Sequence, residues 1–354
     1  MQKKAAIALS GGVDSLFAAY LLKEQGYDVT GIHFTTGYEY SDNSDTSKNI
    51  TYHRKIEDLG KQIGIKIEFI DCSKEFKKNV INYFTQTYKA GKTPNPCLVC
   101  NPLIKFKTVL KFAQKLGCTS LATGHYAGKI LGKDGLFHLL KGKDTRKDQS
   151  YFLSFLSQEQ LSCALFPLYE FTKKEVIRLS EEKGLHPVVQ KESQDICFIK
   201  DNDYGSFLVK ETGFEPQCGI IVDSSGKTIG SHKGIHLFTI GQRRGINCPA
   251  PNPYYVLGID TDSNRVVVGS KNDLLKTHCK IANINWIAKS FSSSVKVHTR
   301  IRYRNKAVPS TLFPEADNCA TIEFETSQSA VTPGQGAVFY IGDEVIGGGF
   351  IENA

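Results

Sequence analysis

The sequence predicts an α/β domain with a doubly wound parallel sheet, followed by a small β domain and a C-terminal β-barrel. In the first half, short apolar runs alternate with segments of helical periodicity, as in strand–helix–strand units. After about Tyr204 this periodicity disappears, and short alternating segments separated by Gly, Pro, Asn and Asp take over. A chain of 354 residues is also long enough for two or three domains. We expect them at 1–204, 205–275 and 277–354.

The first domain is expected to contain four buried strands connected by amphipathic helices. The strands are expected at Ala5–Leu9, Val29–Phe34, Ile67–Ile70 and Ser120–Thr123. The helices are expected at Asp14–Gln25, Lys48–Ile63, Lys74–Tyr88 and Leu103–Leu116, and a glycine follows three of them. Ligands of such sheets bind beyond the carboxyl ends of the strands.

Two further elements are expected before the change to β structure. Residues Lys129–Lys141 read as a hairpin with its turn at Gly132–Gly135. A helix should begin after Thr172, a good N-cap residue, and continue to Lys183, where Gly184 ends it.

The composition is that of an ordinary globular protein, with 40% hydrophobic and 23% charged residues. No apolar run is long enough for a signal peptide or a membrane span, so we expect a cytoplasmic protein without membrane contact. The formal net charge is +8, and residues 71–111 hold eight lysines against two acidic residues. Such a local excess of positive charge favours a polyanionic partner, nucleic acid above all, over a merely solvated helix face.

The turn Leu9–Ser15, L-S-G-G-V-D-S, follows the first strand and opens a helix. Its two glycines let the backbone approach a phosphate, while successive amides and the helix N-terminus present positive charge to it. An aspartate in the first helical turn would repel phosphate, so Asp14 should cap the helix or hold magnesium. The Walker pattern G-x-x-x-x-G-K-[ST] is absent, so this is a different type of phosphate loop.

Three of the ten cysteines stand out. Cys97 and Cys100 form a C-x-x-C after a proline-rich loop, and Cys197 follows a hundred residues later. In a cytosolic α/β protein this pattern favours redox, metal or sulfur chemistry over inert packing. We expect helix-terminal amides together with Lys105 and Lys107 to lower the pKa of Cys100.

Residues Lys296–Lys306 have a basic or potentially basic side chain at every second position. As one strand they would present six basic or potentially basic side chains on one face, which predicts a track for nucleic-acid phosphates. The pair Arg243–Arg244 in the middle domain adds to it.

Two levels of resemblance follow from these motifs. The S-G-G-V-D-S turn resembles the pyrophosphate loop of the PP-loop ATP pyrophosphatases, which adenylate a substrate oxygen. The whole chain resembles the bacterial tRNA-specific 2-thiouridylase (MnmA) family, through motifs that run in order over nearly its full length. These are G-K-T-P-N-P (91–96) with C-N-x-x-I-K-F (100–106), A-T-G-H-Y-A (122–127), D-x-x-K-D-Q-S-Y-F-L (144–153), S-Q-D-I-C-F-I (193–199), H-x-G-x-x-x-x-T-I-G-Q-R-R-G (232–245) and V-T-P-G-Q (331–335).

The resemblance implies ATP-dependent 2-thiolation of the wobble uridine of tRNA, with ATP and magnesium as cofactors. It implies Cys100 as nucleophile and Cys197 as carrier of a persulfide, received from a persulfide or sulfide relay protein. The residues that it implies against ATP are Ala8, Leu9, Ser10, Gly11, Gly12, Val13, Asp14, Ser15, Phe34 and Gly124. The target base would lie against Asn95, Pro96 and Cys97, and tRNA against Lys147, Asp148, Gln149, Arg302 and Tyr303.

The chain departs from the family pattern at Cys97, where relatives usually carry aspartate. The three thiols Cys97, Cys100 and Cys197 are enough to hold a four-iron–four-sulfur cluster with one open iron, which would deliver sulfide directly. Two rival functions remain: a small-molecule ligase of the PP-loop class, and a tRNA-binding protein without catalysis.

Overall fold

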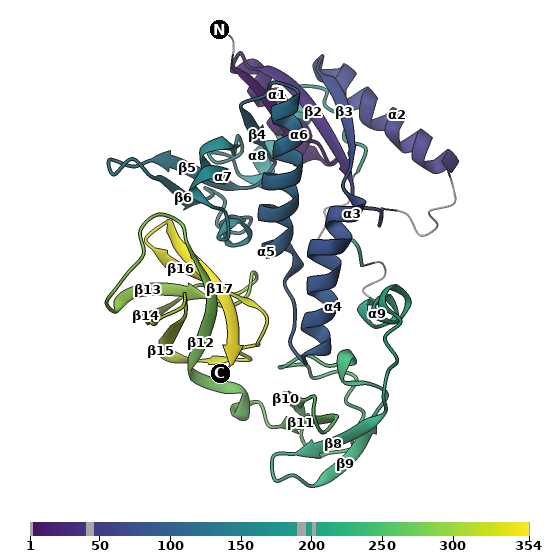
Figure 1. Cartoon of the computed structure of the whole chain (residues 1–354), viewed down its shortest axis with the longest axis vertical. Helices are drawn as coiled ribbons and strands as arrows, with labels where there is room; N and C mark the ends of the chain where they lie inside the picture. The colour runs from purple at the N-terminus through teal and green to yellow at the C-terminus, as the bar shows by residue number, and fades with distance from the viewer. Residues whose placement is uncertain (1–2, 40–45, 190–195, 200–202, 354) are drawn as a thin grey trace.

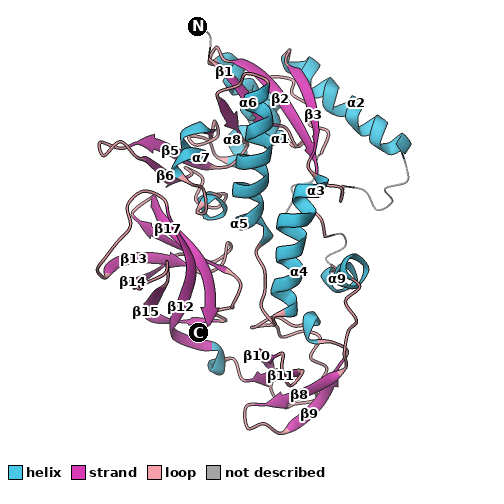
Figure 2. Cartoon of the chain, viewed as in Figure 1, coloured by secondary structure: helices cyan, strands magenta, loops and turns pink. Residues whose placement is uncertain are grey.

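The computed structural model describes residues 3–39, 46–189, 196–199 and 203–353 (Figure 1). Helices concentrate in the N-terminal part of the chain, whereas strands dominate the middle and C-terminal parts (Figure 2). None of the helices in these ranges is long and apolar enough to cross a membrane.

A five-stranded parallel sheet forms the centre of the N-terminal part, which confirms the predicted doubly wound fold. Its strand β1 pairs with β2 on one side and β4 on the other, so the strand order reverses at β1. This reversal is where open α/β sheets bind ligands. In spatial order the strands are β3 (Lys66–Asp71), β2 (Asp28–Thr35), β1 (Lys4–Ala8), β4 (Ser120–Ala122) and β7 (Ala164–Leu165).

Helices cover both faces of this sheet because the side chains of β1 alternate between two cores. Ile7 packs with the first group of helices, and Ala6 and Ala8 pack with the second. The first group is α1 (Val13–Glu24), α2 (Thr46–Ile63) and α8 (Lys173–Glu182). The second group is α3 (Ser73–Phe76), α4 (Asn82–Lys89), α5 (Pro96–Cys100), α6 (Leu110–Lys115) and α7 (Gln158–Cys163).

Two long helical runs contain π-helical segments. Segment η1 (Lys77–Ile81) joins α3 to α4, and η2 (Asn101–Val109) joins α5 to α6. The second run therefore begins at Pro96, earlier than the predicted Leu103. Proline is well suited to a first helical position, where its missing N–H needs no partner. The cysteines of the C-x-x-C are thus helical residues.

The predicted hairpin and the predicted α8 are both present. Strands β5 (Ala127–Leu131) and β6 (Phe137–Lys141) form the hairpin, and Thr172 caps α8 in a reciprocal capping box with Glu175. The prediction that helices end near Tyr204 is wrong, because α9 (Tyr204–Thr212) follows. Asp203 caps its N-terminus, and Gly213 ends it in the left-handed conformation.

The remaining strands form two further sheets. The middle sheet has the order β10 (Tyr255–Asp260), β11 (Arg265–Gly269), β8 (Gly219–Asp223) and β9 (Thr228–His232). The C-terminal barrel closes through pairing of its first and last strands. Its strands, in spatial order, are β12 (Leu275–Trp286), β15 (Ala320–Ser329), β14 (Val308–Pro314), β13 (Val295–Arg300), β16 (Gly336–Ile341) and β17 (Glu344–Asn353). The short 3-10 helices are η3 (Ser150–Leu153), η4 (Ile235–Leu237) and η5 (Asn272–Leu274).

The hairpin of the first domain belongs to the barrel sheet. Strand β6 pairs with β17, with Leu139 opposite Val345. One hydrophobic core also continues from the helices α4, α5 and α6 into the barrel through Ile287, Val338 and Tyr340. The N-terminal domain and the barrel are therefore packed as a single unit, although they lie far apart in sequence.

Candidate active site

The predicted phosphate loop follows β1 at the point where the strand order reverses. Its shape depends on short contacts: the Ser15 hydroxyl lies 3.2 Å from the Ser10 amide and donates to the Gly12 carbonyl at 3.0 Å. Gly11 has a φ of 87°, a conformation that favours glycine. Leu9 is fully buried, so only its backbone faces the loop. This compact turn at the start of α1 has the geometry of an anion-binding site.

Asp14 does not cap α1, so that half of its predicted role is wrong. The N-cap is Gly12, without a side-chain cap bond. Instead, the Asp14 carboxylate accepts hydrogen bonds from Lys173 Nζ at 2.7 and 2.6 Å and from the Tyr126 hydroxyl at 2.7 Å. The lysine comes from the first turn of α8 and offsets the negative charge beside the phosphate loop.

Gly124, which is predicted to lie beside ATP, packs against the phosphate loop. A Cβ atom at this position would come within 2.9 Å of the Asp14 carbonyl carbon and the Ser15 amide nitrogen. Only glycine therefore lets the turn after β4 approach α1. Phe34, near the carboxyl end of the adjacent strand β2, is half-buried.

The two cysteines of the C-x-x-C lie on α5, and both are half-buried. Cys197 is exposed, in the described segment 196–199; residues Ser193–Asp195 of its motif lie outside the described part of the chain. The three thiols are close enough to interact electrostatically. Each of the ten cysteines, all of them described, is a free thiol.

The prediction of a lowered pKa for Cys100 is wrong. Burial raises the pKa of Cys100 to about 12 and that of Cys97 to about 11, and the nearby Lys105 opposes the rise only in part. Cys100 continues directly into η2, so it does not face free helix-terminal amides. Lys107 is exposed and is not among the groups that act on this thiol.

The segment that contains Cys197 is anchored by the neighbouring Phe198. The Phe198 ring is buried among four aromatic rings from other segments, with centroid distances from 5.2 to 6.1 Å. These rings belong to Tyr38, Phe76, Phe84 and Phe207. Protein around the Cys197 thiol desolvates it and raises its pKa, although the residue is exposed.

The three thiols do not fit the proposed iron–sulfur cluster in this arrangement. Among the described residues, which include all three cysteines, no group of three His, Cys, Asp or Glu side chains is placed to hold a metal ion. We therefore derive no step through a cluster.

The loop Gly91–Asn95 before α5 is held by the barrel. The Thr93 amide donates to the Pro333 carbonyl at 2.9 Å, and the Gln335 side-chain amide donates to the Thr93 and Pro94 carbonyls at 3.1 and 3.0 Å. Asn95, at the N-cap of α5, is buried. The V-T-P-G-Q motif of the barrel thus positions the residues that precede Cys97.

The motif Lys147–Gln149 mainly joins the first domain to the barrel. Asp148 is buried and accepts a hydrogen bond from Arg300 of β13 at 3.0 Å. The Gln149 side-chain oxygen accepts from the Tyr126 amide at 3.0 Å. Lys147 is half-buried, so it is more accessible to solvent than the buried Asp148.

The prediction of one continuous basic strand is wrong. Strand β13 ends at Arg300, and the Arg300 side chain turns inward to Asp148. Arg302 is also directed inward: its guanidinium donates to the Ile240 carbonyl at 3.1 Å and to the Thr332 hydroxyl. The Tyr303 ring lies 4.3 Å from that of Phe152. Of the six side chains predicted on one face, Lys296, His298, Arg304 and Lys306 are exposed, as are Arg243 and Arg244 of the middle domain.

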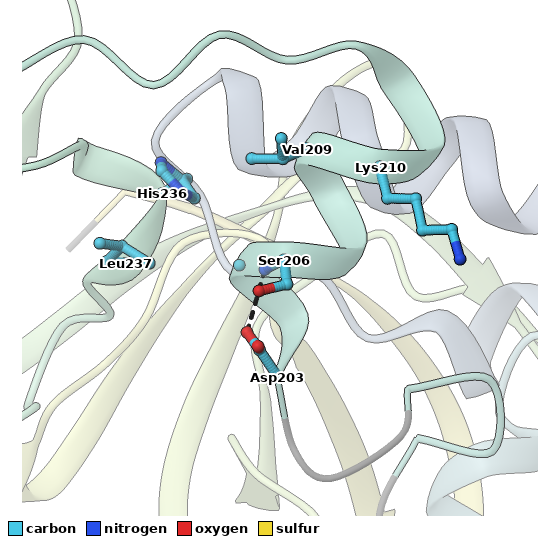
Figure 3. A pocket seen from close by; sticks show the side chains of 7 residues that line it. Asp203, Ser206, Val209, Lys210, His236 and Leu237 are labelled. Carbon is cyan, nitrogen blue, oxygen red and sulfur yellow. Dashed lines mark hydrogen bonds between the residues drawn. The ribbon is translucent and has the colours of Figure 1, made fainter. Parts of the chain in front are cut away.

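The structure also has two open hollows beside α9. One, of about 330 Å³, lies between α9 and η4 (Figure 3). It is lined by Asp203, Gly205, Ser206, Val209, Lys210, His236 and Leu237. The other, of about 360 Å³, is lined by Thr36, Gly37, Tyr38, Ser73, Lys74, Lys77 and Glu211. Neither contains a residue predicted for the site.

The chain is an ATP-binding α/β protein of the PP-loop class. This class is defined by the parallel sheet, by the serine–glycine loop at the point where the strand order reverses, and by the absence of a Walker lysine. Family models agree with this architecture along the whole chain. The tRNA methyl transferase HUP domain matches residues 3–201, the tRNA methyl transferase PRC-barrel domain matches 205–270, and the aminomethyltransferase beta-barrel domain matches 276–351.

Full-length relatives specify the family. The tRNA-specific 2-thiouridylase MnmA of Desulfosudis oleivorans is 46% identical, over 98% of this chain and 94% of that protein. Its counterpart in Geobacter metallireducens is 43% identical, over 100% and 98%. That of Clostridium perfringens is 40% identical, over 99% of each. The chain belongs to the tRNA-specific 2-thiouridylase (MnmA) family.

Proposed function

We propose that this protein uses ATP to replace the 2-oxygen of the wobble uridine in tRNA with sulfur. As a member of the family it is a tRNA sulfurtransferase. One observation supports the proposal above all: the phosphate loop and the three thiols are linked through the turn after β4. Gly124 of this turn touches the backbone of α1, and the next residue, His125, contacts Lys105 beside the cysteines.

The first step is adenylation: the uracil 2-oxygen attacks the α-phosphorus of ATP, the bond to the β-phosphate breaks, and pyrophosphate leaves. ATP binds with its phosphates against the Ser10–Ser15 loop and its nucleoside between Gly124 and Phe34. ATP enters as its magnesium complex, in which phosphate oxygens and water supply most ligands. We assign no metal to Asp14, because Lys173 and Tyr126 already hold its carboxylate. A carbonyl oxygen is a poor leaving group, whereas AMP departs readily.

The second step is sulfur transfer. A donor relay protein places a persulfide on Cys197. The Cys100 thiolate attacks the Cys197 Sγ, the persulfide S–S bond breaks, and the terminal sulfur leaves as hydrosulfide. Hydrosulfide then attacks the adenylated carbon, and AMP leaves with the bonding electrons. The resulting Cys100–Cys197 disulfide needs a dithiol reductant before the next turnover.

The tRNA binds across the first domain, the middle domain and the barrel. The target base lies at the start of α5, against Asn95, Pro96 and Cys97. Lys147 and Tyr303 contact tRNA directly, whereas the inward-facing Asp148 and Arg302 shape that surface from beneath. Exposed arginines such as Arg243 and Arg244 contact phosphates.

The test is thionucleoside analysis of unmodified tRNA incubated anaerobically with the protein, ATP, magnesium and a persulfide donor. The wild type should form 2-thiouridine without bound iron, and Cys197→Ser should not. Activity should survive in Cys97→Ala, or improve in Cys97→Asp, which restores the side chain usual in the family. The opposite outcome is iron that co-purifies with the wild type, with both iron and activity lost in Cys97→Ala. That result would indicate that sulfur is delivered by an iron–sulfur cluster and not by a persulfide.

Pyrophosphate release separates the rival functions. Release that requires tRNA supports adenylation of the base. Release that requires a small molecule in place of tRNA would indicate a ligase, and tRNA binding without release would indicate a catalytically silent binder.

A further inference from the structure

Lys105 stands out among the basic residues near the thiols. It is half-buried and lies five residues after Cys100, within the π-helical segment η2. A π-helix bonds residue i to residue i+5, so this spacing places the two side chains on one face of the run. Lys105 interacts electrostatically with Cys97, Cys100 and Cys197, and in each case its positive charge favours the thiolate.

The Lys105 ammonium is held by a buried histidine. Its Nζ lies 3.3 Å from His125 Nε2, while His125 Nδ1 lies 2.7 Å from the Thr123 hydroxyl oxygen. Burial, and then the charge of Lys105, put the pKa of His125 well below its ordinary value, so the ring is neutral. Nε2 therefore accepts from the ammonium, and Nδ1 carries the proton and donates to Thr123.

The same turn fixes the distance between the two halves of the reaction. Thr123 and His125 flank Gly124, whose backbone packs against Asp14 and Ser15 of the phosphate loop. A lysine held by this turn has a defined position relative to both the bound nucleotide and the thiols.

The other titratable groups near the thiols oppose Lys105. Cys72 is buried and acts on Cys100, and the exposed Glu39 acts on Cys197; both disfavour a thiolate. The thiols also disfavour ionisation of one another. Among the groups that act on Cys100, Lys105 is therefore the one that favours its thiolate.

We propose that Lys105, held by neutral His125, is a positioning residue that stabilises the Cys100 thiolate and so raises the reactivity of Cys100 at a given pH. This inference rests on the proposed function, in which that thiolate attacks Cys197. No proton transfer by Lys105 is required, because its fixed charge is sufficient.

The test measures the rate of alkylation of Cys100 by iodoacetamide as a function of pH, followed by peptide mass spectrometry on the full chain. Lys105→Met should move the midpoint of the profile upward by about one pH unit, which is about a tenfold slower reaction at neutral pH. Lys105→Arg should retain most of the wild-type profile. Lys107→Met, two residues further along η2 and exposed, is the matched control and should leave the profile unchanged.

An unchanged midpoint in folded Lys105→Met would overturn the inference, as would an equal shift in Lys107→Met. His125→Gln provides a second route should Lys105→Met fold poorly: it should move the midpoint in the same direction by less, and no movement would count against the inference. The alkylation profile does not depend on tRNA or ATP. If the wild type does not thiolate tRNA, the proposed function is wrong. The alkylation profile would still measure the effect of Lys105 on Cys100.

Discussion

The phosphate loop and the thiol site are linked through the turn after β4, yet they are built in opposite ways. The loop is a contiguous turn whose Ser10 and Ser15 contact each other directly. The thiol site combines α5, η2 and the Cys197 segment, and its order depends on the aromatic packing of Phe198 and on the barrel loop at Pro333. A contiguous site depends on local conformation, whereas an assembled site depends on every contact that brings its parts together.

The largest predicted effect is a loss of thiolation without a loss of pyrophosphate release, which would show that the thiol site and the phosphate loop act separately. Cys100→Ser and Cys197→Ser should each reduce thiolation by about a thousandfold or more, because a hydroxyl cannot replace a sulfur nucleophile or carry a persulfide. tRNA-dependent pyrophosphate release should continue at a near wild-type rate. Cys319→Ser, in the barrel, is the control and should affect neither assay. Equal loss of pyrophosphate release would mean that the two sites act as one.

Breaking the buried ion pair at the barrel interface tests the assembled site. Asp148→Ala leaves the Arg300 guanidinium without its carboxylate and should lower the free energy of unfolding by about 3–5 kcal/mol, measured by denaturant titration. Thiolation should decrease more than pyrophosphate release. Asp343→Ala removes an exposed partner of Lys141 and should change stability by less than about 1 kcal/mol.

Gly124→Val tests the contiguous site. Its side chain would clash with the backbone of Asp14 and Ser15 and displace the loop, so pyrophosphate release should decrease by about a hundredfold. Gly258→Ala is the matched control, because a Cβ there meets no atom within 4 Å. A Gly124→Val protein with wild-type pyrophosphate release would show that the turn can move away from α1.

The smallest effect concerns pH at the hairpin–barrel contact. Hydrogen bonds to Glu344 at 2.6 Å and to Asp134 at 3.1 Å raise the pKa of His138 above its ordinary 6.5. This contribution to stability is fully present below pH 6.5 and is lost as pH rises through the raised pKa. We expect it to be less than about 1 kcal/mol, because the partners are partly exposed. Denaturant titrations of wild type and His138→Gln should converge at high pH, and a constant difference between them would contradict this explanation.

The sequence predicted most of the first domain because its signals are local. Strand–helix alternation, the serine–glycine turn and the Thr172 cap each depend on residues close together in the chain. Helix α9 was missed although its signals were present: Asp203 and Gly213 mark its ends, and the side chain of Leu208 is buried. These signals were not used, because residues 205–275 had been assigned to β structure.

The burial and the partners of individual charged and thiol groups could not be predicted from such local signals. Arg300 and Arg302 have the same residue type as the exposed Arg304, and only their partners Asp148 and Thr332 show that they face inward. The sign of the Cys100 pKa shift was also predicted wrongly, because proximity to lysines was visible in the sequence and burial was not.

By itself, the sequence determined the class of fold, the phosphate loop and the family, because these depend on local pattern and on motifs in a defined order. Only the tertiary structure decided which thiols lie together, which charge acts on them and which arginines are directed inward. Burial and charge pairing depend on segments that are distant in sequence, such as Cys100 and Cys197 or Asp148 and Arg300, and no local pattern encodes their distance.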